Sequence, residues 1–118
     1  MSYIATNPAS YAGQVVGGGQ CVAFVKAAAG APQTSLWQQG AAVSGSPIAA
    51  GTAIATFQAG QYTNTPGISH AAIYINQDAN GLLVWDQWSG QPVHQRPIGF
   101  KGGVGAPVDD GNAYFIIE

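Results

Sequence analysis

The most apolar segment of the chain covers residues 21–29 (CVAFVKAAA) and contains one charged residue, Lys26. Alanine-rich sequence followed by a glycine and a proline, here Gly30 and Pro32, is typical of the end of an α-helix. Because the other residues of this helix are apolar, we expect it to be buried on most sides. A further helical turn is expected at residues 35–40, with Trp37 as its anchor.

After Gly51 the pattern changes to short apolar runs separated by turn residues, which is typical of β-strands. The expected strands span residues 52–57, 70–76, 82–88, 92–98 and 113–117. The second and third are joined by QDANG, whose Asn80-Gly81 pair favours a hairpin. A buried N-terminal helix packed on an antiparallel sheet of about five strands is an α+β fold. Without an internal repeat or a break in composition, residues 1–118 are expected to form a single domain.

Composition excludes several classes of function. Three Lys and Arg against five Asp and Glu give a net charge of −2, so no basic surface for nucleic acid is expected. No apolar run approaches the roughly 18 residues of a membrane span, and the N-terminal residues MSYIATNP do not resemble a Sec signal peptide. One cysteine and two histidines do not suggest structural zinc, and Gly17–Gly19 lacks the lysine of a phosphate-binding loop. We therefore expect no cofactor and no metal.

Cys21 is the candidate nucleophile. It follows a glycine-rich loop and begins the predicted helix, where free N–H groups and the helix dipole favour a thiolate. A lone cysteine is otherwise usually a small buried apolar side chain, so catalysis needs a base and an orienting group elsewhere. His70 opens an apolar strand, from which it can face the helix N-terminus, whereas His94 lies among polar residues and is expected to be exposed. His70 is the preferred base and His94 the reserve.

The orienting group is expected on the strand at residues 82–88. Asp86 is an acid inside an apolar run, which is costly unless it has a partner such as the imidazole of His70. If residues 76–80 form the hairpin loop, His70 lies directly opposite Asp86. If Asn80-Gly81 alone forms the loop, Gln87 shares the face of His70 instead, and both registers remain open.

These motifs carry a family resemblance. Residues 19–25 (GQCVAFV) are similar to the signature that opens the catalytic helix of CHAP domains, and residues 69–75 (SHAAIYI) resemble the histidine strand of the NlpC type. Together with residues 84–88 (VWDQW), they make the chain resemble the papain-like superfamily and, within it, small bacterial amidases of the type VI effector kind. An Asp as the third residue is familiar mainly from amidase effectors, because CHAP and NlpC enzymes commonly carry His, Asn, Gln or Glu there.

The resemblance implies an amidase or endopeptidase that hydrolyses amide bonds in bacterial peptidoglycan peptides through an acyl-thioester on Cys21. His70 would act as acid and base, and Asp86 would hold His70. The Cys21 N–H and a loop donor, with Gln20 and Gln14 as candidates, would stabilise the oxyanion. The resemblance also implies non-Sec export from the cytoplasm to the periplasm of a target cell, with a cognate immunity protein as a possible partner.

Two other interpretations of the sequence remain open. A papain-like site can also serve a cysteine protease or acyltransferase that acts on another amide or ester. An inactive binding module would instead have a Cys21 thiol of ordinary reactivity. Trp88 shares strand parity with Asp86 and is the candidate platform for a substrate chain, whereas Trp37 and Trp85 are expected in the core.

Overall fold

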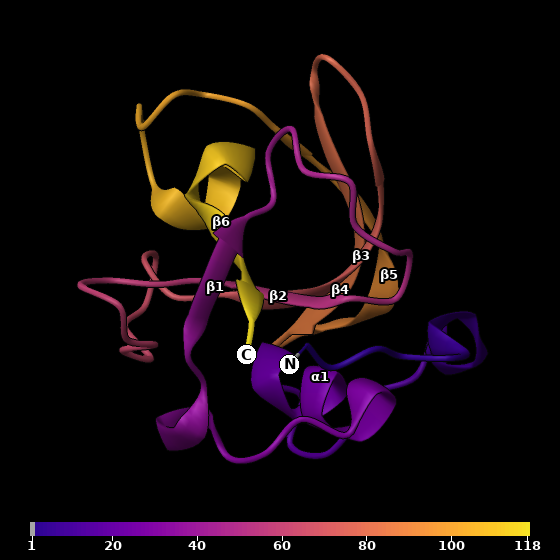
Figure 1. Cartoon of the computed structure of the whole chain (residues 1–118). Helices are drawn as coiled ribbons and strands as arrows, with labels where there is room; N and C mark the ends of the chain where they lie inside the picture. Colours follow the sequence, from indigo (N-terminus) through magenta and orange to yellow (C-terminus); the bar gives the residue numbers. More distant parts are fainter. Residues whose placement is uncertain (1) are drawn as a thin grey trace.

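The computed structural model describes residues 2–118 and shows a helix packed against a sheet (Figure 1). The described residues contain the helix α1 (Cys21–Ala29) and six strands, β1 (Gln39–Ala42), β2 (Ala53–Thr56), β3 (Ala71–Gln77), β4 (Gly81–Trp88), β5 (Gln91–Gly99) and β6 (Tyr114–Ile117). All paired strands are antiparallel, in the order β1-β6-β2-β3-β4-β5. Helix α1 packs on β3 and β4. The α+β architecture and the five expected strands are therefore confirmed.

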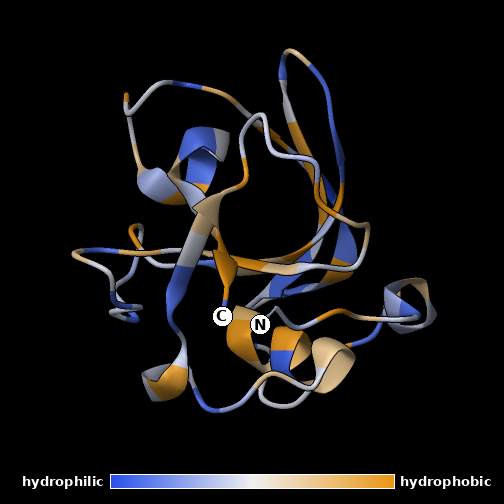
Figure 2. Cartoon of the chain, in the orientation of Figure 1, coloured by the Kyte–Doolittle hydropathy of each residue, from blue (hydrophilic) through white to orange (hydrophobic). Residues whose placement is uncertain are grey.

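Helix α1 has the predicted bounds but is less buried than predicted. The helix ends at Gly30, which adopts a left-handed conformation with φ 68° and donates its N–H to the Lys26 carbonyl at 3.0 Å. Only Phe24 and Val25 are fully buried, whereas Lys26 and Ala27 are exposed. Figure 2 shows the mostly apolar helix with one hydrophilic patch. Alanine exposes little apolar area, so an apolar sequence here does not require burial on most sides.

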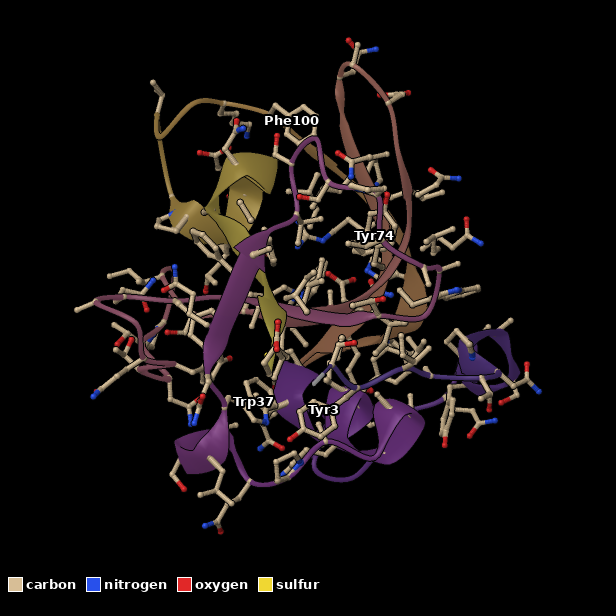
Figure 3. All side chains as sticks on the ribbon, in the orientation of Figure 1. Tyr3, Trp37, Tyr74 and Phe100 are labelled. Atoms are coloured by element: carbon tan, nitrogen blue, oxygen red, sulfur yellow. The ribbon has the colours of Figure 1, made fainter. Side chains whose placement is uncertain are left out.

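The sheet is covered on both faces. Alternate residues of β2 and β3 enter two different apolar clusters, so both strands are buried throughout their apolar parts. One cluster, beside α1, includes Phe24 and Trp37, and the other includes Tyr74 and Tyr114. In Figure 3 the labelled Trp37 and Tyr3 lie near α1, whereas Tyr74 and Phe100 lie away from it. Burial on both faces explains why these strands have continuous apolar sequences rather than alternating ones.

The segment after α1 differs in part from the prediction. A 3-10 turn covers Thr34–Leu36, but the chain is extended from Trp37 and forms β1 from Gln39, which the sequence did not predict. Gln39–Ala42 (QGAA) contains no β-branched residue, and this strand exists through its pairing with β6. Trp37 is the expected anchor, since it is 4% exposed and its Nε1 donates to the Pro32 carbonyl at 2.9 Å.

The β3–β4 hairpin has neither of the two registers considered from sequence. Near the turn, Gln77 pairs with Leu82 and Asn76 with Leu83. Further from the turn, Tyr74 pairs with Val84 and Ile73 with Trp85. The register therefore shifts by one residue at a β-bulge, where Ile75 is the extra residue of β3. Turn chemistry alone does not reveal such a bulge, which changes the face occupied by every β3 residue that precedes it.

Candidate active site

Cys21 lies at the first position of α1, after a loop that the fold brings close to the helix. The preceding Gln20 is extended, with φ −74° and ψ 150°, and no side chain caps the helix. Gly17 has φ 58°, and a Cβ atom there would lie 2.9 Å from the Cβ of Ala23, so the loop needs a glycine at this point. Cys21 is half-buried and is a free thiol. The helix N-terminus therefore presents the sulfur at the protein surface.

The loop before Cys21 is fixed by Gln87 of β4. The buried side chain of Gln87 accepts from the Val16 N–H at 3.0 Å and donates to the carbonyls of Val16 at 2.9 Å and Gln20 at 2.8 Å. Neighbouring residues of a strand point to opposite faces, so Gln87 reaches this loop while Asp86 faces the other way. Gln87 is thus a support of the cysteine loop and not the partner of His70.

We expect Gln87→Glu to lower the free energy of unfolding by about 2–4 kcal/mol, because a carboxylate would replace the amide donor that faces two carbonyl oxygens. The loss would be measured by urea unfolding. The control is Gln95→Glu on β5, where the side chain is exposed and the expected change is within about 0.5 kcal/mol. Equal stability of the two variants would contradict the supporting role of Gln87.

His70 is held at the start of β3 by its backbone and its ring. Its N–H donates to Thr56 Oγ1 at 3.0 Å, and its carbonyl accepts from the Thr56 N–H at 3.0 Å. Its Nε2 lies 2.8 Å from Asp86 Oδ2, which leaves Nδ1 as the nitrogen available to Cys21. His70 is 7% exposed and Asp86 is fully buried. The structure therefore brings together all three residues predicted from sequence, Cys21, His70 and Asp86.

Asp86 has two further basic neighbours, both on β5. Arg96 Nε donates to Asp86 Oδ2 at 2.8 Å, the oxygen that also contacts His70. His94 Nε2 lies 3.0 Å from Asp86 Oδ1 without the alignment of a hydrogen bond. His94 is directly opposite Asp86 in the β4–β5 ladder, so its side chain is half-buried beside the site instead of exposed as expected. The buried carboxylate of Asp86 is thus compensated by the Arg96 guanidinium and the His70 ring, which both contact Oδ2.

The protonation of the site follows from these contacts. Burial would raise the pKa of Cys21, but hydrogen bonding to His70 and the charge of His70 outweigh burial and lower it. Burial would likewise lower the pKa of His70, but its interactions with Asp86 and Cys21 raise it to about 9. For Asp86 the contacts with His70 and Arg96 overcome burial and lower the pKa. These contacts favour a carboxylate on Asp86, an imidazolium on His70 and, compared with a free cysteine, a thiolate on Cys21.

A cleft of about 420 Å³ opens in front of Cys21 and His70. Its walls are formed by Gln20, Cys21, Tyr62, Asn64, Thr65, Pro66, Gly67, Ser69, His70, Trp88, Ser89, Arg96, Val108 and Asp109. Trp88 lies on this wall and is 42% exposed, whereas Trp85 packs against the core, as their strand parity predicts. Gln20 lines the cleft, but Gln14 does not, because its Nε2 donates to the Ser10 carbonyl at 3.0 Å.

Two residues of the site were missed from the sequence. Tyr62 belongs to the segment between β2 and β3, and its Oη lies 3.6 Å from Cys21 Sγ. No local pattern marks a loop tyrosine as part of a site. Arg96 did have a signal, since it is one of only three basic residues and lies two positions after His94 on the same strand. Its side chain also lies over the Trp88 ring, 5.4 Å from the centroid.

The part of the chain that the structure describes holds neither a metal-binding cluster nor a membrane-spanning helix. Within residues 2–118, no three His, Cys, Asp or Glu side chains are grouped so that they could hold a metal ion. Over the same residues, no helix has the length and apolar character needed to cross a membrane.

A helix that begins with cysteine, packed on an antiparallel sheet whose strands supply a histidine and its acidic partner, defines a papain-like cysteine hydrolase. Residues 1–117 match the family model described as domesticated amidase effector 2. The protein belongs to this family. The predicted papain-like fold is thus confirmed, and the family shown is that of the amidase effectors and not CHAP or NlpC.

Individual relatives agree with this assignment. The chain is 36% identical over 112 residues to a type VI secretion amidase effector 2 protein of Salmonella typhi, covering 84% of each chain. It is 36% identical over 107 residues to domesticated amidase effector 2 of Ixodes scapularis, covering 84% of this chain and 70% of that protein. Among solved structures it is similar to a type 6 secretion amidase effector 2, with a TM-score of 0.85 and 35% identity. The match covers 98% of this chain and 94% of that structure's chain.

Proposed function

We propose that this protein is a cysteine amidase that hydrolyses amide bonds in the peptides of bacterial peptidoglycan. The observation that carries the proposal is the contact network of Cys21, His70 and Asp86 at the cleft, in a chain of the amidase effector family. A peptide in the cleft can approach the sulfur directly, because Cys21 and His70 both line it.

The roles follow from the protonation of the site. The Cys21 thiolate attacks the amide carbonyl carbon, and a C–S bond forms while the carbonyl electron pair moves to oxygen. The C–N bond then breaks as the His70 imidazolium gives its proton to the leaving amine. Neutral His70 next takes a proton from water, whose oxygen attacks the thioester and releases the acid and the thiolate. Asp86 positions the His70 ring and stabilises its charged form throughout.

Peptidoglycan lies outside the cytoplasm, and type VI secretion is named in the descriptions of two relatives. We therefore extend the proposal to delivery into the periplasm of a target cell by this non-Sec route, as a single amidase domain. A producing cell would then need protection, which a cognate immunity protein that blocks the cleft could supply.

Product analysis tests the proposal. Purified Gram-negative peptidoglycan would be incubated with the protein, and released muropeptides identified by mass spectrometry. The control is the same protein alkylated with iodoacetamide, which modifies one site because the chain has one cysteine. We expect new fragments only from the untreated protein, each pair summing to its parent peptide plus one water. Intact peptidoglycan in both samples would contradict the proposal and favour another amide or ester substrate.

The site also predicts the pH dependence of Cys21. Because the pKa of Cys21 is lowered, the pH at which iodoacetamide alkylation reaches half its maximal rate should lie below that of free glutathione, whose rate falls about tenfold per unit below pH 8.5. Hydrolysis should decline as the pH rises through about 9, where His70 loses the proton needed by the leaving amine. An alkylation profile like that of glutathione would contradict the ion pair.

A further inference from the structure

Tyr62 contacts the sulfur of Cys21 but has no role in the mechanism above. Its Oη lies 3.6 Å from Cys21 Sγ, within the range of a hydrogen bond to sulfur. Cys21 comes from α1, whereas Tyr62 comes from the loop between β2 and β3, so the two residues approach the cleft from different elements. Both line the cleft, which places the hydroxyl beside the space where a substrate carbonyl must lie.

The position of Tyr62 is fixed by packing. Its ring lies against Trp37, with 5.0 Å between centroids and 59° between planes. Trp37 is 4% exposed and donates to the Pro32 carbonyl, so the ring that supports Tyr62 is itself anchored. A hydroxyl on a supported ring is preorganised, which is the property that makes a donor effective toward charge that develops during a reaction.

The phenol also keeps its proton in the presence of the thiolate. Burial and the negative charge of Cys21 both raise the pKa of Tyr62 well above its ordinary value. When Cys21 is a thiolate, the hydrogen bond between the two groups must therefore run from the Tyr62 O–H to sulfur. Once sulfur has bonded to carbon, the negative charge moves to the former carbonyl oxygen, and the same O–H can turn toward it.

Neither of the two glutamines expected to supply an oxyanion donor makes a hydrogen bond to Cys21 Sγ, as Tyr62 does. The Gln14 side chain donates to the Ser10 carbonyl at 3.0 Å and does not line the cleft. Gln20 lines the cleft, but its amide lies against Gly18, where Oε1 is 2.7 Å from the place that a Cβ atom would take. Of these three side chains, Tyr62 is the one in contact with the sulfur.

We propose that the Tyr62 hydroxyl is a catalytic hydrogen-bond donor, which holds the resting thiolate and then stabilises the oxyanion together with the Cys21 N–H. The inference rests on the proposed amidase function. In the addition step the Cys21 Sγ–carbon bond forms and the carbonyl π pair moves to oxygen. Tyr62 donates a hydrogen bond to this oxygen and retains its proton. When the intermediate collapses, the C=O bond re-forms and the C–N bond breaks, with the amine taking its proton from His70.

The test is Tyr62→Phe, which removes the hydroxyl and keeps the ring that packs on Trp37. We expect kcat on peptidoglycan fragments to fall about 10²-fold, with KM changed less than about threefold. The pH at which the alkylation rate of Cys21 reaches half its maximum should rise, since a hydrogen bond to the thiolate is lost. The control is Tyr11→Phe, where the hydroxyl contacts the Ala27 carbonyl and the ring packs on Phe24, and parent kinetics are expected.

The outcomes distinguish the role of Tyr62 from the proposed amidase function. Circular dichroism and thermal unfolding would first establish that both variants are folded like the parent. A folded Tyr62→Phe protein with parent kcat would overturn the role of Tyr62 and leave the amidase proposal intact, as would a raised KM with unchanged kcat. If the parent itself cleaves no peptidoglycan, the amidase proposal fails, and with it the oxyanion role. An unshifted alkylation profile in Tyr62→Phe would also overturn the donation to the resting thiolate.

Discussion

Cys21→Ala should reduce the rate of peptidoglycan cleavage by at least about 10⁴-fold, since no other group in the cleft can form the thioester. Cys21→Ser should lose a similar factor, because a serine hydroxyl stays protonated beside His70 at neutral pH. The measurement is the rate of muropeptide release at pH 7. Activity of either variant within tenfold of the parent would show that Cys21 is not the nucleophile.

Cys21→Ala should also change the titration of His70, which tests the contact between the two residues without an activity measurement. The raised pKa of His70 depends in part on the hydrogen bond and the charge of Cys21. In Cys21→Ala the pKa of His70 should therefore fall from about 9, as followed by the NMR titration of its ring protons.

Asp86→Asn should lower kcat by about 10³–10⁴-fold, although the side chain keeps its shape. An amide cannot stabilise the imidazolium as a carboxylate does, so the pKa of His70 should fall and that of Cys21 should rise. The checks are kcat and the pH profile of Cys21 alkylation. The matched control is Asp78→Asn, whose exposed carboxylate accepts from the N–H groups of Asn80 and Gly81 in the β3–β4 turn and does not line the cleft.

The Asp86 substitution should also change the pH dependence of stability. The pKa of Asp86 is lower in the folded protein than the value of about 3.9 expected when unfolded. Its contribution to stability is thus complete above that unfolded value and is lost as the pH falls through the folded value. The parent should be the more stable protein at pH 7, and the difference should shrink below about pH 4. A gap that stays constant down to pH 2 would contradict the charged state of Asp86.

The sequence could predict the parts of this site that depend on local signals. Cys21 precedes a helix with a clear glycine and proline stop, and His70 precedes an apolar run, so each occupies the end of an element that was recognised correctly. Asp86 could be chosen only on chemical grounds, as an acid in an apolar strand. In the structure it contacts His70 because the register places both on one face.

The remaining parts depend on tertiary contacts. β1 has no strand-like sequence and forms through β6, and the exposure of α1 depends on what packs beside it. Gln87 and Asp86 are adjacent, so which of them faces His70 was decided by a bulge that no turn rule describes. Tyr62 and Arg96 reach the cleft from separate segments. Only the folded chain brings Tyr62 to Cys21 and Arg96 to Asp86.

The bulge at Ile75 limits how the length of this protein can vary. Ile75 lies five residues after His70, about 17 Å along an extended strand, yet because Ile75 is left out of the β3–β4 ladder, His70 shares a face with Asp86 and not with Gln87. Removing or adding a single residue between them would exchange Asp86 for Gln87 as the neighbour of His70. Residues 78–80, beyond the last β3–β4 pair, carry no such requirement, so an engineer can lengthen or circularly permute the chain there without altering the alignment of the site.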